Sequence, residues 1–284
     1  MKRFMTVLLS VLLTVGCIGC TSSGLIRYAN AEKYTAGGFT YEASEITAVD
    51  IDWAAGDITL QSGKGTLSVS ESGGETLDEA DRLHWWIDGS TLKIKYCESG
   101  RISTVSASQK DLTVELPDFV DLKIDIASGK IAAENMLNLG VLDVNTASGG
   151  VGIEYLSAKE VKIDTASGGV NLAHAVISGA IRINSASGGV TSEILGADSV
   201  RIDVASGGVK LRVNMVNSID IDSVSGGVNL QLASPERGAK VRCETVSGTV
   251  NIKLPYEKSG KTYTIGLGDI DVSIDAVSGT ITVE

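Results

Sequence analysis

The sequence predicts an all-β fold, namely a single-domain β-solenoid (β-helix) of about nine coils with a 19–20 residue repeat. The first observation behind this prediction is a Ser-Gly pair that recurs along the chain, at Ser128, Ser148, Ser167, Ser187, Ser206, Ser225, Ser247 and Ser278. The second is the alternation of apolar and polar residues on both sides of the pair, as in residues 161–172. The third is a composition of 33 Gly, 3 Pro and only 5% aromatic residues, which suits a thin core of small aliphatic side chains.

Each repeat has the pattern of strand, turn and strand. Residues 161–164 alternate between apolar and polar, and residues 170–172 do so again after the turn. The glycine after each serine is expected at a corner that needs a positive φ or a close approach of the neighbouring coil. A sandwich of β-hairpins is the alternative all-β fold. It explains the alternation but not the recurrence of one corner in every repeat.

Residues 1–20 have the features of a bacterial export signal, with a basic start, an apolar run and small residues before a cysteine. Cys17 and Cys20 both follow a glycine, as the modified cysteine of bacterial lipoproteins does. Cys20 is the preferred lipidation site, with Cys17 as the alternative, because the polar residues 21–24 then form a tether. An uncleaved membrane anchor and plain secretion are the other interpretations, and the apolar run is close to the shortest length that spans a bilayer. All of them place the rest of the chain outside the cytoplasm.

The remaining chain is predicted to form one domain. Residues 21–45 have no clear period and are expected to be a linker, and residues 46–284 are expected to form the solenoid. Within it we expect degenerate N-terminal coils and a cap (46–120), regular coils (121–254), and a loop followed by the last coil (255–284). In the degenerate part, the adjacent Trp85 and Trp86 would face opposite sides of a strand. They favour a hydrophobic cap over a ligand platform.

Charge limits the possible partners. The chain has 35 acidic and 24 basic residues, for a net charge of −11. Nucleic-acid binding requires basic patches that neutralise phosphates, so nucleic acid is not an expected partner. An acidic surface also keeps an exported protein soluble.

The repeated unit Ile-Asp-x-Ala/Val-Ser-Gly-Gly-Val, the cysteine-bearing signal and the segment at residues 28–37 resemble the bacterial "putative adhesin" family, a family with a domain of unknown function. The resemblance covers nearly the whole mature chain. It implies a β-solenoid displayed on the cell envelope, and some relatives are tied to envelope-stress responses. It brings no catalytic residues.

One polar position recurs in every repeat and would align into an acidic column, at Asp52, Asp125, Asn145, Asp164, Asn184, Asp203, Asp222, Glu244 and Asp275. Carboxylates about 5 Å apart could serve a glycosidase, but an active site would break the repeat and this column does not. A string of weak Ca²⁺ sites is the second interpretation, with Asp164, Asp203 and Asp222 as candidates. The preferred interpretation is structural. Asp and Asn would accept hydrogen bonds from neighbouring backbone N–H groups, and basic residues two positions earlier would neutralise the charge.

No other pattern indicates catalysis or a resident metal. The serines are expected to bond backbone groups at the corners, because the two histidines, His84 and His174, lie far apart in the sequence. Cys97 and Cys243 are expected to be separate buried thiols. No glycine-rich phosphate loop joins a strand to a helix.

The sequence therefore favours a non-catalytic binding or scaffold protein without cofactors, attached to the outside of the cell membrane. A surface protein or a glycan is the expected class of ligand. The alternatives are an envelope-stress sensor or regulator and, more remotely, a β-helical carbohydrate-active enzyme.

Overall fold

The structure is a computed structural model, which describes residues 25–42, 45–63, 65–73, 76–101, 110–234 and 237–284. The described residues are almost entirely strand, so the predicted all-β class is confirmed. The only helical elements among them are two 3₁₀ turns, η1 (Ala31–Lys33) and η3 (Glu79–Asp81). None of these residues belongs to a helix long and apolar enough to cross a membrane. Cys17 and Cys20 lie outside the described residues.

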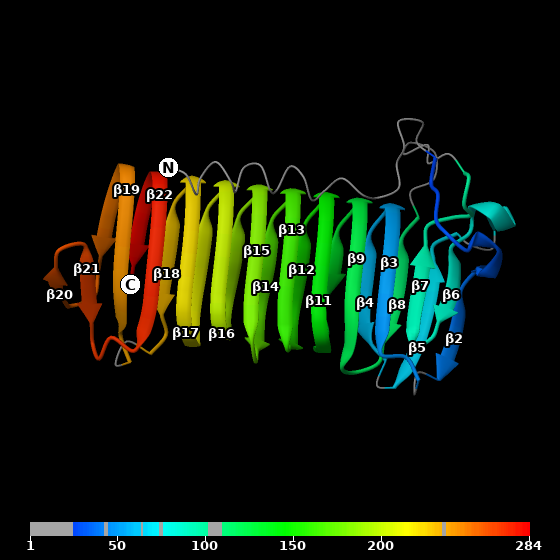
Figure 1. The fold of residues 1–284 in the computed structure, drawn as a ribbon, viewed down its shortest axis with the longest axis horizontal. Coiled ribbons are helices and arrows are strands. Elements are labelled where there is room, and N and C mark those ends of the chain that lie inside the picture. The colour runs from blue at the N-terminus through cyan, green and yellow to red at the C-terminus, as the bar shows by residue number, and fades with distance from the viewer. Residues whose placement is uncertain (1–24, 43–44, 64, 74–75, 102–109, 235–236) are drawn as a thin grey trace.

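The strands lie side by side along the long axis of the molecule, roughly perpendicular to it (Figure 1). The N-terminal strands are β1 (Thr35–Ala36), β2 (Phe39–Glu42), β3 (Ala48–Ala55), β4 (Ile58–Ser62), β5 (Thr66–Glu71), β6 (His84–Asp88), β7 (Thr91–Lys95) and β8 (Leu112–Leu116). The middle strands are β9 (Val120–Ser128), β10 (Ile131–Ala133), β11 (Leu137–Ser148), β12 (Val151–Ala158), β13 (Glu160–Ser167), β14 (Val170–Ile177), β15 (Ala180–Ser187), β16 (Val190–Ser206), β17 (Val209–Ser225) and β18 (Val228–Leu232). The C-terminal strands are β19 (Ala239–Ile252), β20 (Tyr256–Ser259), β21 (Thr262–Ile265) and β22 (Ile270–Val283).

Successive repeats pair in parallel, so equivalent residues of each repeat lie next to each other. Ile163 on β13, for example, pairs with Val144 on β11 and with Ile183 on β15. This parallel register contradicts the alternative sandwich of antiparallel hairpins for the middle repeats. The inward apolar residues then form continuous columns, and Ile163 is fully buried. Burying one such side chain contributes about 1.5–3 kcal/mol, but only while a neighbouring repeat covers it.

The glycine corners have the geometry that the sequence predicts. Seven glycines of the column have φ between +129° and +147°, namely Gly129, Gly149, Gly168, Gly188, Gly207, Gly226 and Gly279. Their N–H groups donate to the neighbouring repeat, as Gly188 N does to Ser206 O at 2.9 Å. The column serines were predicted to hydrogen-bond backbone groups at the corners, but other hydroxyl residues make these bonds. The corner carbonyls of Gly168 and Gly188 accept from the inward hydroxyls of Thr165 (3.5 Å) and Ser185 (3.1 Å), two residues before each column serine.

The order of strands at both ends differs from the order in the chain. At the N-terminal end, β3 lies between β7 and β9, so the first repeat is internal. At the C-terminal end, β22 pairs with β17 and β18 on one side and with β19 on the other. The expectation that residues 255–284 provide the last coil is therefore corrected, because β19 is outermost. Placing β22 inside gives this final strand two neighbours to cover its apolar residues.

The segment predicted as a linker at residues 21–45 is, in its described part, packed against the N-terminal strands. Residues 35–36 pair with β6, and β2 pairs with β5. Ile26 is buried against Ala54 and Cys97, and the Tyr28 hydroxyl donates to Cys97 O at 2.9 Å. No alternating pattern in the sequence predicts this packing, because the contacts are made with a distant part of the chain.

The N-terminal end is capped around a buried ion pair. Lys110 Nζ lies 2.6 Å from Glu71 Oε2, and both side chains are at most 3% exposed. The ammonium also lies over the ring of Tyr96, and the Trp53 indole donates to Lys110 O at 3.0 Å. Burial lowers the pKa of Lys110, and the hydrogen bond to Glu71 opposes that shift.

The two adjacent tryptophans also pack within this cap. Trp85 stacks on Phe39, with ring centroids 4.0 Å apart. Trp86 meets Tyr34 edge-on at 5.7 Å and lies between the ammonium groups of Lys33 and Lys93. These contacts agree with the predicted cap.

Candidate functional site

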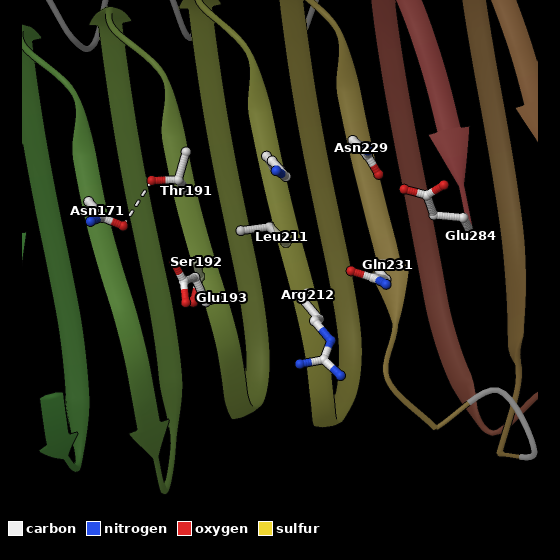
Figure 2. A pocket seen from close by; sticks show the side chains of 10 residues that line it. Asn171, Thr191, Ser192, Glu193, Leu211, Arg212, Asn229, Gln231 and Glu284 are labelled. Carbon is white, nitrogen blue, oxygen red and sulfur yellow. Dashed lines mark hydrogen bonds between the residues drawn. The ribbon is translucent and has the colours of Figure 1, made fainter. Parts of the chain in front are cut away.

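A polar groove of about 490 Å³ crosses the strands of the C-terminal half (Figure 2). It is built on β14, β16, β17 and β18 together with the end of the chain. Its lining residues are Asn171, Thr191, Ser192, Glu193, Lys210, Leu211, Arg212, Asn229, Gln231 and Glu284. Most of them are outward residues of the alternating strands, which the parallel register brings into rows across neighbouring repeats.

Hydrogen bonds fix part of this surface. Thr191 Oγ1 donates to Asn171 Oδ1 at 2.9 Å, as Figure 2 shows. At the other side of the groove, Lys253 Nζ donates to Glu284 Oε2 at 2.6 Å. Hydrogen bonds from Lys253 and Asn229 hold the pKa of Glu284 below its ordinary value, so this carboxylate is ionised at neutral pH.

The groove has balanced charge. Two cations, Lys210 and Arg212, and two carboxylates, Glu193 and Glu284, face the same space. Arg212 forms no ion pair with any residue that the structure describes, so its guanidinium donors remain available. Amide, hydroxyl and charged groups of both signs suit a ligand that donates and accepts hydrogen bonds without carrying a large charge.

An exposed aromatic pair lies on β12 and on β14, the strand that also carries the groove residue Asn171. The rings of Tyr155 and His174 stack with centroids 4.9 Å apart and planes 21° apart. Tyr155 is 40% exposed, and His174 is on β14 three residues after Asn171. Glu154 Oε1 lies 3.8 Å from His174 Nδ1. This pair provides a flat, partly exposed aromatic surface.

The predicted acidic column is present as one continuous row. Its members pair in register from Asp52 through Asp125, Asn145, Asp164, Asn184, Asp203, Asp222 and Asp275 to Glu244. The donors differ from those expected. Side chains, and not backbone N–H groups, donate the hydrogen bonds to the carboxylates of Asp52, Asp125, Asp164, Asp203, Asp222 and Glu244. Asn145 Nδ2 donates to Asp125 at 2.7 Å, and Asn184 Nδ2 donates to Asp164 at 2.6 Å.

The three Ca²⁺ candidates are not gathered at one point. Asp203 and Asp222 are neighbours in the row, whereas Asn184 separates Asp164 from Asp203. Asp164 has Lys162 Nζ at 3.0 Å. Arg201 donates to both oxygens of Asp203 at 3.0 Å and to Asp222 at 3.1 Å.

Arg201 also forms an ion pair with Asp220, at 2.6 Å, so that one guanidinium contacts three carboxylates. Burial, followed by repulsion from Asp203 and Asp220, raises the pKa of Asp222 to about 6.

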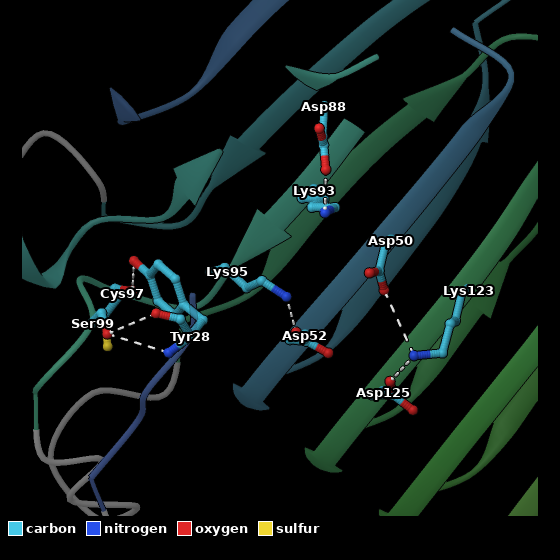
Figure 3. Close-up of polar contacts among 10 residues, drawn as sticks. All are labelled: Tyr28, Asp50, Asp52, Asp88, Lys93, Lys95, Cys97, Ser99, Lys123 and Asp125. Carbon is cyan, nitrogen blue, oxygen red and sulfur yellow. Dashed lines mark hydrogen bonds and ion pairs between the residues drawn. The ribbon is translucent and has the colours of Figure 1, made fainter. Parts of the chain in front are cut away.

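A tighter acidic cluster lies near the cap, where Asp50, Asp52 and Asp125 have carboxylate oxygens within 4.8 Å of one another (Figure 3). Among the described residues, it is the only group of three or more acidic, histidine or cysteine side chains that lie close enough together to hold a metal ion. Two lysines form ion pairs with this acidic cluster. Lys95 pairs with Asp52, and Lys123 lies 2.5 Å from Asp125 and 3.9 Å from Asp50. Burial raises the pKa of Asp52, and Lys95 opposes the shift.

Sequence reasoning missed several of these residues. The groove residues Lys210 and Arg212 and the aromatic Tyr155 belong to ordinary alternating strands, with no motif of their own. Asp50 had a usable signal, since it is two residues before a column member and thus on the same strand face. Lys95 enters the row only because β7 packs beside β3.

The remaining candidates show no chemical constellation. Cys97 and Cys243 are free and buried, as expected, and burial raises their pKa values to about 11 and about 12. His84 Nδ1 contacts Arg82 O, and His174 contacts Glu154. Neither ring hydrogen-bonds a serine hydroxyl in the part of the chain that the structure describes.

Comparison with solved structures shows where this fold recurs. The chain is similar to a "putative adhesin" from Bacteroides fragilis, with 17% identity, a TM-score of 0.50, and coverage of 87% of this chain and 96% of the other. It is also similar to a "putative lipid binding protein" from Parabacteroides distasonis, with 17% identity, a TM-score of 0.54, and coverage of 88% and 97%. At this identity the likeness shows the fold alone. Comparison with curated proteins gave no match.

The family model described as Toastrack DUF4097 matches residues 46–284, which include the acidic column, the groove and both ends of the stacked strands. The match covers most of the chain. This protein therefore belongs to the Toastrack DUF4097 family.

Proposed function

We propose that this protein is a non-catalytic binding protein of the bacterial cell surface, whose groove and Tyr155–His174 pair together bind a glycan. The proposal includes the finer description of the fold as a solenoid of about nine coils, which presents the groove on a rigid rod. It also includes attachment to the membrane through a lipid on Cys20, with Cys17 or an uncleaved N-terminal anchor as the alternative.

The observation that carries this proposal is the combination of a charge-balanced polar groove with an exposed aromatic surface. A sugar ring has an apolar face that packs on aromatic rings and a rim of hydroxyls that both donate and accept. Arg212 can donate such hydrogen bonds, and Glu193 can accept them. The parallel register extends the surface across several repeats, which suits an extended chain of sugars.

The contacts of the acidic column support a non-catalytic role. A general acid and a nucleophile need two carboxylates in different surroundings, so that their pKa values separate. In the column, equivalent carboxylates recur with cation or amide partners along many repeats. The similarity to solved proteins that carry adhesin names agrees with a surface location.

The ligand proposal is tested on the full chain with an array of neutral and acidic oligosaccharides. Binding is expected, and Arg212→Ala and Tyr155→Ala are each expected to weaken it about tenfold or more. Arg182→Ala is the matched control, because Arg182 is an exposed arginine of β15, outside the groove. Absence of binding to every oligosaccharide, or equal binding by all variants, would reject the proposal.

Attachment is tested separately by fractionation of cells. Cys20→Ser is expected to release the protein into the medium or to leave an uncleaved precursor, while Cys17→Ser changes little. Acyl chains contribute about 0.8 kcal/mol for each buried CH₂, and two chains hold a protein stably. Recovery of the wild-type protein in the cytoplasm would contradict the surface location.

A further inference from the structure

The two ends of the stacked strands are covered differently. At the N-terminal end, antiparallel strands cover both sides, since β6 pairs with β7, and β5 pairs with β8 and β2. At the C-terminal end, β21 pairs only with residues 239–242 of β19. The remainder of β19, up to Ile252, has β22 as its only strand neighbour among the described residues. Its outer edge therefore offers free backbone donors and acceptors.

Apolar residues on this edge are less covered than their counterparts. Val250 is only partly buried, although Val228 and Ile281 in the same column are at most 1% exposed. Ile252 is also partly buried, whereas the equivalent Leu230 and Val283 are fully buried. Residue 246 is a valine with 80% of its surface exposed. Val250 and Ile252 thus occupy core positions of the repeat that no further repeat covers.

The edge also lacks the residues that normally block strand pairing. Proteins protect open edges with charged side chains, proline or a covering element. Residues 245–252 read Thr-Val-Ser-Gly-Thr-Val-Asn-Ile and contain neither a charge nor a proline. The nearest charges flank the segment, with Glu244 before it and Lys253 after it. The hairpin of β20 and β21 stops short of this segment.

We propose that residues 244–253 pair with the same segment of a second copy of this chain, antiparallel and around a two-fold axis. A two-fold axis in this position makes the two identical strands antiparallel. Each contact between two residues then occurs twice in the interface. Antiparallel pairing brings Glu244 of one copy toward Lys253 of the other, beside the ion pairs that Glu244 forms with Arg242 and Lys253 forms with Glu284 in their own chains. It also covers Val246, Val250 and Ile252. The result is an end-to-end dimer that leaves both grooves open.

The first test is cross-linking of the full chain in intact cells. Thr249→Cys places a thiol on the exposed edge near the proposed axis, and a mild oxidant is expected to convert it to a disulfide-linked dimer. Asn171→Cys is the control, because Asn171 is exposed in the middle of the stack. Chance collisions in the membrane would cross-link both variants. Equal cross-linking of the two variants, or none at Thr249→Cys, would overturn the proposal.

The second test is the light-scattering mass of the full chain in mild detergent, with the detergent contribution subtracted. The unmodified protein is expected to have the mass of two chains. Val246→Lys with Asn251→Lys places like charges on both copies and is expected to reduce the mass to one chain, with an unchanged far-UV circular dichroism spectrum as evidence that the fold is retained. A dimer that survives both lysines would locate the interface elsewhere and reject this one. Cross-linking of Thr249→Cys to a different protein would show that the edge binds a foreign strand.

Discussion

A Cβ atom on Gly188 would lie only 2.1 Å from the carbonyl oxygen of Gly168 in the adjacent repeat. The same relationship connects successive glycines of the column, so the repeats approach one another most closely at this corner. The shape of the stack therefore depends on a residue without a side chain at each of these positions.

Gly188→Ala is expected to destabilise the protein by about 3 kcal/mol or more, because it combines a backbone collision with a φ of +147° that L-residues rarely adopt. Chemical denaturation measures the change. Gly152→Ala is the control, since nothing lies within 4 Å of its Cβ position. An equal effect of both substitutions would show that loss of glycine flexibility, and not the close approach, determines the result.

Asp222→Asn is expected to stabilise the protein at pH 7. The pKa of this carboxyl is raised from 3.8 to about 6, so the native state holds its proton more tightly than the unfolded state does. Stability from this group is present below about pH 4 and is lost as the pH rises through about 6. The substitution should add about 1–2 kcal/mol at pH 7, after allowance for solvent screening, and nothing near pH 4.

Melting temperatures between pH 4 and 7 measure this effect. Asp269→Asn is the control, because it removes an exposed negative charge outside the column. A similar gain from Asp269→Asn would attribute the result to net charge and not to the cluster around Arg201.

Ser192→Val is expected to stabilise the protein by about 1–2 kcal/mol. Ser192 occupies an inward position between Leu172 and Leu211, its Oγ is buried without a hydrogen-bond partner, and it lines a small internal void. Valine removes the unpaired hydroxyl and fills space. Ser192→Ala removes the hydroxyl alone and should give a smaller gain. If alanine were the more stable of the two variants, the site would be too tight for valine.

Breaking the cap ion pair is expected to cost about 3–5 kcal/mol, because it leaves an uncompensated charge in the core. Lys110→Met alone should show this cost in denaturation experiments. Lys110→Met combined with Glu71→Leu should recover much of the stability, since no charge remains buried. If the two substitutions had additive costs, the two side chains would not be coupled.

Calcium is expected to change the melting temperature very little. Asp164 and Asp203 already have Lys162 and Arg201 as partners, so a cation would have to displace them. A ligand that binds only the native state raises its stability by RT ln(1 + [L]/Kd). A large shift in millimolar Ca²⁺ that Asp164→Asn and Asp203→Asn together abolish would contradict this expectation.

Much of the fold could be predicted from the sequence because its determinants are local. Alternation within residues 161–164 sets which side chains face inward, and Gly168 sets the corner. Once repeats stack in register, the column from Asp52 to Glu244 must align, whatever the details of each repeat. The sequence by itself thus determined the all-β class, the position of the corners and the acidic row.

Only the tertiary structure decided the order of strands at the ends, the folding of residues 25–42 onto the cap, and the position of the groove. The repeat period predicts that each strand pairs with a neighbouring strand, but it does not identify that neighbour. β22 can cover its apolar residues against β17 or β19, and it contacts both because the 31-residue step between Ser247 and Ser278 is long enough to let the chain double back. Contacts such as Lys95 with Asp52 or Tyr155 with His174 arise from that packing, and alternation within a single strand carries no information about them.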